Sequence, residues 1–252
     1  SPAYSYAWTT VDGSGLTPTD EDQSSLTAGT YDVTVSDING CTITSSITLT
    51  EPTALTESTT AFTYPSGDNI SCFGLADGSI DLTNTDGSPA YSYAWTTVDG
   101  SGLTPADEDQ AGLTAGTYDV TVSDINGCTI TSSITLTEPT ALTESTTAFT
   151  YPSGDNISCF GLADGSIDLT NTDGSPAYSY AWTTVDGSGL VPTDEDQSGL
   201  TAGTYDVTVS DINGCTVTSS ITLTEPTALT ESTTAFTYPS GDNISCFGLA
   251  DG

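Results

Sequence analysis

Hydrophobic and polar residues alternate along most of the chain, in short runs that are separated by turn-forming residues. A period of two residues is typical of β-strands that bury one face, and no segment shows the helical period of about 3.6 residues. The apolar residues that share a face in the clearest runs are Ile80 and Leu82; Tyr91, Tyr93 and Trp95; Tyr118, Val120 and Val122; and Ile130, Ile134 and Leu136. The pattern therefore predicts an all-β protein.

Pairs of the Asp-Gly and Asn-Gly type separate these runs, for example Asp86-Gly87, Asp99-Gly100 and Asn126-Gly127. Such pairs supply the positive φ angles that tight hairpins need. Residues 113–118 have the sequence of a tyrosine corner, and Trp95 lies where the core tryptophan of strand C is expected. With roughly seven short strands per unit, these features favour an immunoglobulin-like β-sandwich of the PKD or fibronectin-III kind.

The sequence repeats every 87 residues, because the segment that begins at Ser1 returns at Ser88 and Ser175. A Glu-Pro pair follows the last strand of each unit, and proline lacks the N–H that a strand ladder requires. These pairs divide the chain into a partial repeat with strands C–G (1–51), two complete repeats (52–138 and 139–225), and a partial repeat with the first strand and the A–B turn (226–252). We expect an internal stretch of a longer array, in which tandem sandwiches form an elongated rod.

The chain carries 34 acidic residues and no lysine, arginine or histidine, so its formal net charge is −34. Nucleic-acid phosphates and anionic lipid head groups repel such a polyanion, and no apolar run is long enough for membrane insertion. Without histidine and lysine, a Ser-His-Asp triad and a Schiff base cannot form. We therefore predict a protein that is not an enzyme, requires no cofactor, and has neither a nucleic-acid partner nor a membrane-inserted segment.

Calcium is the metal for which the composition offers ligands, because Ca²⁺ binds about six to eight oxygen atoms. In a seven-strand sandwich the B–C and F–G turns lie at one end, close to the end of the preceding repeat. The calcium hypothesis therefore groups Asp86 and Asp124 with Glu51, and Asp173 and Asp211 with Glu138. The competing interpretation is a set of solvated acidic turns.

Three ordered motifs recur in the repeats: ISCFGLADGSI at 70–80, GSPAYSYAW at 87–95, and the hairpin that runs from Leu113 to Cys128. Together they resemble the SprB-type repeat. Members of that family are long surface proteins of gliding and other Bacteroidota, and the best known are adhesins that the type 9 secretion system exports and that move along the cell during gliding. The resemblance implies an extracellular location on a bacterial surface and a role as an adhesin stalk or filament.

Each complete repeat contains two cysteines, and an extracellular setting favours disulfides. Within a repeat, Cys72 would pair with Cys128 and Cys159 with Cys215, and the alternation turns these cysteines inward. Between repeats, Cys72 would pair with Cys215, because the A–B and F–G turns lie at opposite ends of a sandwich and a disulfide needs Cα atoms within about 7 Å. We favour the pairing within a repeat, on the premise that the long segment 59–69 re-routes Cys72.

The sequence thus predicts a structural and adhesive repeat region of a cell-surface protein, acting as a stalk or filament that presents an adhesive surface. Its partners would be the neighbouring repeats of the same chain, with lateral self-association into filaments or contact with extracellular glycans and surfaces. The alternative is a multivalent module in which each repeat binds a glycan or surface directly.

Overall fold

The computed structural model describes residues 3–244, 247 and 250, and this part of the chain consists of strands and turns without a helix. No helix in the described residues is therefore long and apolar enough to cross a membrane. The strands are β1 (Ser5–Thr10), β2 (Gly29–Ser36), β3 (Thr42–Leu49), β4 (Thr56–Ala61), β5 (Gly78–Thr85), β6 (Ser92–Thr97), β7 (Gln110–Leu113), β8 (Gly116–Ser123), β9 (Thr129–Leu136), β10 (Thr143–Ala148), β11 (Gly165–Thr172), β12 (Ser179–Thr184), β13 (Gln197–Leu200), β14 (Gly203–Ser210) and β15 (Thr216–Leu223). The all-β prediction is confirmed.

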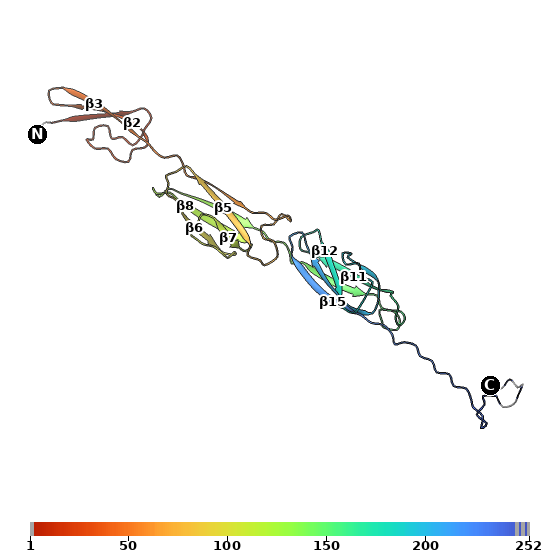
Figure 1. The fold of residues 1–252 in the computed structure, drawn as a ribbon. Coiled ribbons are helices and arrows are strands. Elements are labelled where there is room, and N and C mark those ends of the chain that lie inside the picture. Colours follow the sequence, from red (N-terminus) through yellow and green to blue (C-terminus); the bar gives the residue numbers. More distant parts are fainter. Residues whose placement is uncertain (1–2, 245–246, 248–249, 251–252) are drawn as a thin grey trace. The chain divides into compact units, whose positions relative to one another are not determined.

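The chain divides into two compact units. One comprises Ser1–Ala61, Ser79–Ala111 and Thr117–Thr135, and the other comprises Phe62–Gly78, Gly112–Gly116 and Leu136–Gly252. The second unit contains the whole of repeat 139–225, which therefore shows the complete fold of one repeat (Figure 1).

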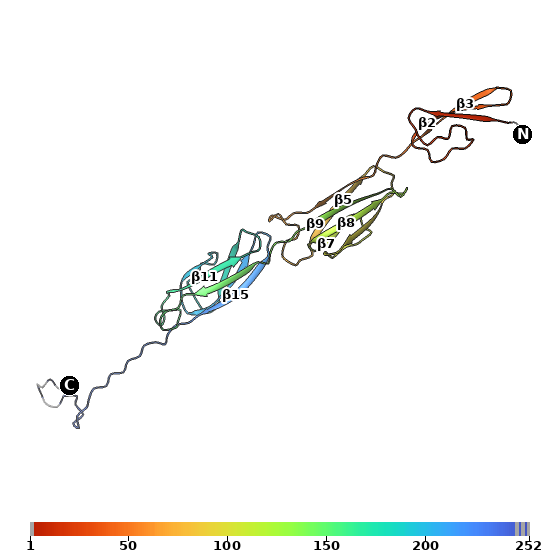
Figure 2. The ribbon, with the colours of Figure 1, turned by 180° about the vertical axis from the view of Figure 1, so that it is seen from behind.

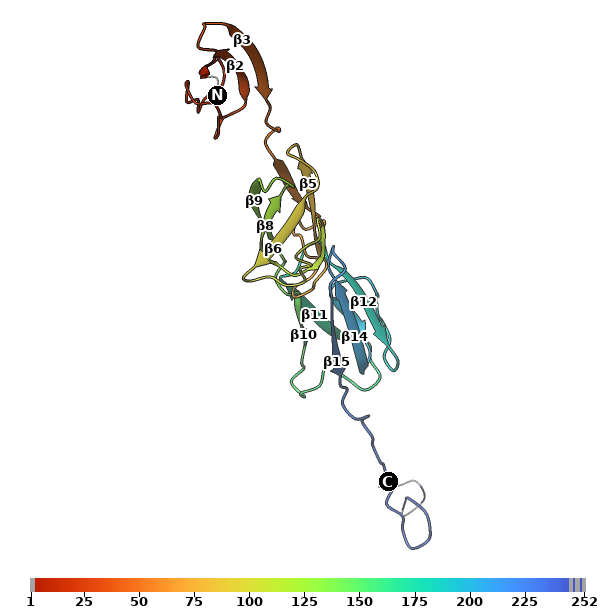
Figure 3. The same ribbon diagram turned by 90° about the vertical axis from the view of Figure 1, so that its left-hand side faces the viewer.

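Repeat 139–225 is an immunoglobulin-like sandwich of two antiparallel three-stranded sheets, with strand orders β10-β11-β13 and β12-β14-β15 (Figure 3). The corresponding orders in repeat 52–138 are β4-β5-β7 and β6-β8-β9. Each complete repeat thus has six strands, one fewer than expected. The stretch 185–196 forms turns instead of a further strand. There the buried Gln197 side chain bonds the backbone of Val191 and Asp194.

Alternation along the strands builds the core of repeat 139–225. Its buried members come from both sheets and from the loop before β11: Ile157, Ile167, Leu169, Trp182, Leu200, Tyr205, Val207, Val209 and Leu223. A Cβ added to Gly165 would lie 2.7 Å from Cδ1 of Ile157 and 3.0 Å from the Leu200 carbonyl oxygen, so a side chain at the start of β11 would force its neighbours to shift. The expected strand-C tryptophan is confirmed, since Trp182 is buried and its Nε1 donates to the Asp194 carbonyl at 3.0 Å.

The tyrosine corner is also present. The buried Tyr205 hydroxyl lies 2.8 Å from the Thr201 carbonyl and 3.0 Å from the Ser188 carbonyl, and it accepts from the Ser188 N–H. This contact explains the glycine of the preceding Asp-Gly pair, because a Cβ on Gly187 would lie 2.4 Å from the hydroxyl oxygen. The need at Gly187 is for space and not for a positive φ, which the sequence had suggested for every such pair. At Asp173-Gly174 both residues do have positive φ, 62° and 64°.

The two partial repeats show what an incomplete sandwich leaves unpaired. Repeat 1–51 forms the sheet β1-β2-β3 (Figure 2). Its register is that of β12-β14-β15, yet Ile43 on its inner face is 71% exposed. The expected first strand of repeat 226–252 does not form within 226–244. Its counterparts β4 and β10 pair with β5 and β11.

Candidate functional site: a disulfide-linked contact between consecutive repeats

The loop 62–78 of repeat 52–138 is held in shape by its own side chains. The Asp77 carboxylate accepts hydrogen bonds from the Ser71 N–H at 3.1 Å, from the Ser71 hydroxyl and from the Tyr64 hydroxyl at 3.1 Å. Desolvation raises the pKa of the Asp77 carboxyl, but the hydrogen bonds from Ser71 and Tyr64 outweigh it and hold the pKa below its usual value. Phe62 packs edge-on against Tyr64, with ring centroids 5.0 Å apart. The loop therefore has a defined conformation.

The same loop is bound to the end of its own repeat. The N–H groups of Asn69 and Ile70 both donate to the Thr137 carbonyl at 3.0 Å, and the Thr137 N–H donates back to the Asn69 side chain at 3.1 Å. The Gly74 N–H donates to the Glu138 carboxylate at 2.5 Å. Together these bonds hold Cys72 at the Glu-Pro boundary, where the next repeat begins. We call this folded loop, residues 62–78, the seat.

The hairpin between β14 and β15, residues 211–215, is the other half of the contact, and we call it the plug. One oxygen of the buried Asp211 accepts from the N–H groups of Asn213 and Cys215, at 3.0 and 2.9 Å. Its other oxygen accepts from the Ser175 N–H at 3.0 Å. The B–C and F–G turns therefore meet at one end of the sandwich, as the sequence predicted, and Asp211 fixes the direction in which Cys215 points.

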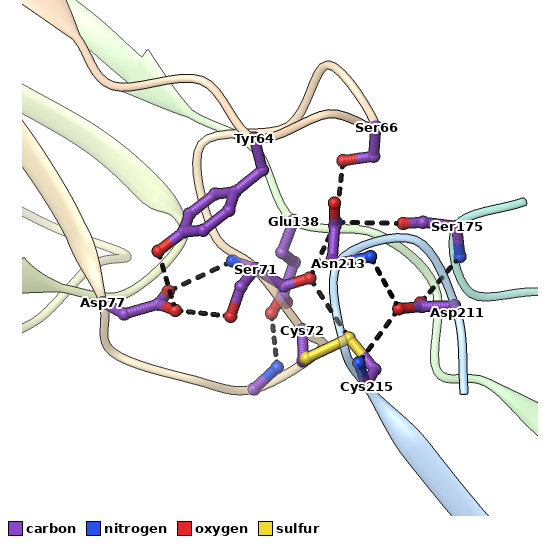
Figure 4. Close-up of a disulfide and its surroundings, with 11 residues drawn as sticks. Tyr64, Ser66, Ser71, Cys72, Asp77, Glu138, Ser175, Asp211, Asn213 and Cys215 are labelled. Carbon is purple, nitrogen blue, oxygen red and sulfur yellow. Dashed lines mark hydrogen bonds between the residues drawn. A yellow bond between two sulfur atoms is a disulfide. The ribbon is translucent and has the colours of Figure 1, made fainter. Parts of the chain in front are cut away.

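A disulfide joins seat and plug: Cys72 is bonded to Cys215, with their Cα atoms 5.6 Å apart (Figure 4). The Asn213 amide reinforces it, because Nδ2 lies 2.9 Å from the Ser66 hydroxyl and 2.9 Å from the Ser71 carbonyl. The same nitrogen lies 3.2 Å from the Ser175 hydroxyl of its own repeat. Asn213 thus bridges two repeats beside the disulfide. The sequence identifies the equivalent Asn126 only as a turn residue, because no local pattern marks a contact with Ser66 of another repeat.

The repeats of this chain provide the same plug in a second, unlinked state. In repeat 52–138 the Asn126 amide donates to the Ser88 hydroxyl at 2.8 Å, the counterpart of the Ser175 contact. Cys128 is an exposed free thiol, whereas Cys215 is half-buried. The plugs at 124–128 and 211–215 have the same sequence, and only the second engages a seat, so Asn126 and Cys128 are matched controls for Asn213 and Cys215.

The observed bond corrects the pairing that we favoured from the sequence. Cys128 and Cys159 are free, and Cys72 is linked to Cys215. The geometry of repeat 139–225 gives the reason. The loop around Cys159 is bonded through Asn156 and Ile157 to Thr224, after β15, whereas Cys215 precedes that strand of eight residues. A strand of that length spans about 26 Å, far beyond the reach of a disulfide. Cys246 lies outside the described residues.

Two segments, residues 67–100 and 154–187, match the family described as SprB repeat. Each begins inside the seat or its equivalent and runs through the next two strands. Both segments are similar to the SprB repeat. This confirms the family resemblance of the sequence motifs. The SprB segments include Cys72 and Cys159, whereas the plug cysteines lie beyond them. No curated protein matches the chain.

Several solved structures resemble the chain. They include the N-terminal eight Ig domains of Down Syndrome Cell Adhesion Molecule isoform 1.30.30, with 10% identity, a TM-score of 0.41, and coverage of 88% of this chain and 33% of that chain. A second is Drosophila OTK extracellular domains 3–5, with 11% identity, a TM-score of 0.36, and coverage of 90% and 86%. The chain spans about a third of the first structure's length. The sandwich assignment of the SprB repeat rests on its strand order and core.

The acidic residues of the calcium hypothesis do not assemble into a site. Among the described residues, no three Asp, Glu, Cys or His side chains come together in a way that could hold a metal. Asp211 and Glu138 bond backbone N–H groups of the plug and seat. Asp124 likewise accepts hydrogen bonds from backbone N–H groups in its own hairpin. Desolvation raises the pKa of the Asp124 carboxyl, but the hydrogen bonds from Cys128, Ser88 and Asn126 outweigh desolvation and lower the pKa. Asp86 accepts a weak bond from Thr53, Asp173 lies in the Asp-Gly turn, and Glu51 lies exposed at the repeat boundary.

We expect electrostatic screening to govern how the stability of the repeats responds to cations. With a net charge of −34, carboxylates repel one another, and added salt weakens that repulsion. We expect the melting temperature to rise with NaCl, and to rise equally with CaCl₂ at matched ionic strength, as measured by calorimetry. A further increase specific to Ca²⁺, at millimolar concentration, would contradict this prediction.

Removal of the Asn213 amide should expose the disulfide to reductants. Asn213→Ala deletes the side-chain bonds to Ser66 and Ser71, which together contribute about 1–2 kcal/mol to the closed contact. We expect dithiothreitol to reduce Cys72–Cys215 about 5–30 times faster in this variant, because each 1.4 kcal/mol corresponds to about a factor of ten. The rate is measured by quenching with a maleimide and counting labelled thiols by intact mass. Asn126→Ala, the matched control, should leave the rate unchanged, and equal acceleration by both variants would contradict the assignment.

Proposed function

We propose that this chain is the repeat region of a bacterial cell-surface protein and forms a stalk or filament that holds an adhesive surface away from the cell. The observation that carries the proposal is the Cys72–Cys215 bond, which joins one repeat covalently to the next in addition to the main chain. A stalk needs many equivalent units and a defined connection between them. The near-identical SprB repeats supply the units, and the seat and plug supply the connection.

The family resemblance supports the finer part of this proposal. Proteins with SprB-type repeats include adhesins of gliding Bacteroidota that the type 9 secretion system exports, and a protein that remains outside the cell is compatible with a stable disulfide. The stalk role uses the folded repeats as mechanical units and requires no catalytic centre. Neighbouring repeats are its primary partners.

Small-angle X-ray scattering of oxidised chains with two, three and four repeats tests the stalk. A sandwich with strands of eight residues should add roughly 35–45 Å per repeat, so the maximum dimension should grow linearly with repeat number. A particle that stays compact as repeats are added would refute the proposal. A glycan array with the same chains tests the alternative, because binding that strengthens with repeat number would favour direct recognition by each repeat.

A further inference from the structure

The disulfide spans more sequence than one repeat. Cys72 and Cys215 are separated by 143 positions, whereas the repeat is 87 residues long. The loop that the bond closes therefore extends beyond the start of the next equivalent loop, which would begin at Cys159. Loops of this length, placed at intervals of 87 residues, overlap without a gap.

The closed loop contains almost all of both complete sandwiches. Of their strands, only β4 and β15 lie outside the segment between Cys72 and Cys215. A force that pulls the two ends of the chain apart enters the loop at Cys72 and leaves it at Cys215. The shortest covalent path between these points is the S–S bond, so the segment between them carries no tension while the bond is intact.

We propose that Cys72–Cys215 is a load-bearing link that carries tension past the folded sandwiches, and that equivalent bonds of consecutive repeats overlap so that a disulfide and the main chain both cross every junction. The inference deepens the stalk proposal, on which its biological purpose rests. Its physical basis is the connectivity of the bond and the repeat length.

The chain also contains a free seat around Cys159 and a free plug at Cys128, which would form links to the following and to the preceding repeat, respectively. Around Cys159, Asp164 accepts from the Ser158 N–H at 3.1 Å and Glu225 accepts from the Gly161 N–H at 2.6 Å, as Asp77 and Glu138 do in the engaged seat. In the free plug, Asp124 accepts from the Cys128 N–H at 2.9 Å, the distance found at Cys215. Neither half needs to reorganise, so a further link costs little conformational entropy.

Each new link is formed by thiol–disulfide exchange with a protein or small-molecule disulfide. The seat thiol of one repeat and the plug thiol of the next lose two protons and two electrons as their S–S bond forms. The donor disulfide takes up both and leaves as two thiols. No other oxidant is required.

Overlap limits how far such an array can extend. In such an array the covalent path that carries the load alternates between disulfides and short stretches of main chain. After each plug cysteine it follows the main chain for 31 positions to the next seat cysteine, as from Cys128 to Cys159, and then crosses a further junction through a disulfide. Two repeats are therefore spanned by about 31 load-bearing residues, or about 110 Å at full extension. Without the disulfides, all 174 residues of two repeats would extend to about 600 Å. The links reduce the maximum extension roughly fivefold.

Single-molecule force spectroscopy of the 252-residue chain, held at its two ends, tests the load path. The oxidised chain should release about 500 Å less contour length than Cys215→Ser, because 143 residues stay behind the bond. Dithiothreitol should release the same length from the wild type, a test that is independent of how the variant folds. Cys128→Ser, the matched control, should behave like the oxidised wild type. Equal release before and after reduction would overturn the proposal, whatever length scattering gives for the stalk.

Thiol counting tests the overlap. The 252-residue chain has six cysteines, and with one bond four should react with a maleimide. One additional repeat at the C-terminal end adds two cysteines and, through Cys159, one bond, so the count from intact mass should stay at four. An increase to six labelled thiols would show that Cys159 stays free and would overturn the overlap.

Discussion

Replacement of Cys215 by serine should lower the free energy of unfolding of the two complete repeats by up to about 5 kcal/mol. A disulfide restricts the unfolded chain, and the chain-entropy model gives about this value for a loop of 143 residues. The folded state loses little, since the seat and the plug are each held by their own hydrogen bonds. The unfolding transition in guanidinium chloride, followed by tryptophan fluorescence, should move to lower denaturant concentration.

Cys128→Ser is the matched control for this measurement. Cys128 has the same hairpin and the same Asp124 hydrogen bond, but its thiol is free and exposed. Its replacement should leave the transition within about 0.5 kcal/mol of the wild type, as expected for a surface substitution. If the two serine variants unfold at the same denaturant concentration, the Cys72–Cys215 bond does not stabilise the repeats.

The fold could be predicted from the sequence because alternation, turn pairs and the tyrosine corner are local signals. Val207 and Val209 are buried as their period of two requires, and Tyr205 reaches Thr201 only four residues away. The stretch 185–196 was harder to predict. It bonds through the side chain of Gln197 rather than through a strand ladder, and a single buried glutamine has no periodic signature.

The candidate site could be predicted only in part, because it joins residues from two repeats. The alternation that turns Cys72 inward says nothing about which plug it meets. The opposite-ends argument, which concerns three-dimensional placement, identified Cys215 correctly as the alternative partner. The long segment 59–69 suggests from the sequence that Cys72 is brought toward Cys128. In the structure it instead contributes Ser66 to the contact with Asn213, and the seat is bonded to Thr137 and Glu138.

Truncation of the core tryptophan should be about as damaging as the loss of the disulfide, but only where the sandwich is complete. We expect Trp182→Ala to destabilise repeat 139–225 by about 3–5 kcal/mol, the usual cost of removing a large buried aromatic side chain. Trp8→Ala is the matched control. Trp8 donates to the Asp20 carbonyl at 2.9 Å, as Trp182 donates to Asp194, but it is only half-buried against a single sheet. The comparison therefore removes the same hydrogen bond from both repeats and isolates packing between sheets.

Hydrogen exchange measured by mass spectrometry can separate these two effects despite the near-identity of the repeats. Val191 and Val217 occur only in repeat 139–225, and Ser24-Ser25 occurs only in repeat 1–51, so peptides that contain them report on one repeat each. In Trp182→Ala, the Val217 peptide of β15 should lose about 3–5 kcal/mol of protection. In Trp8→Ala, the Ser24-Ser25 peptide should lose less than about 1.5 kcal/mol, because Trp8 already lacks a facing sheet and leaves a smaller cavity. Equal losses in both repeats would mean that the facing sheet contributes little to the stability of the core, contrary to the burial of Ile167 and Leu169, which lie on that sheet.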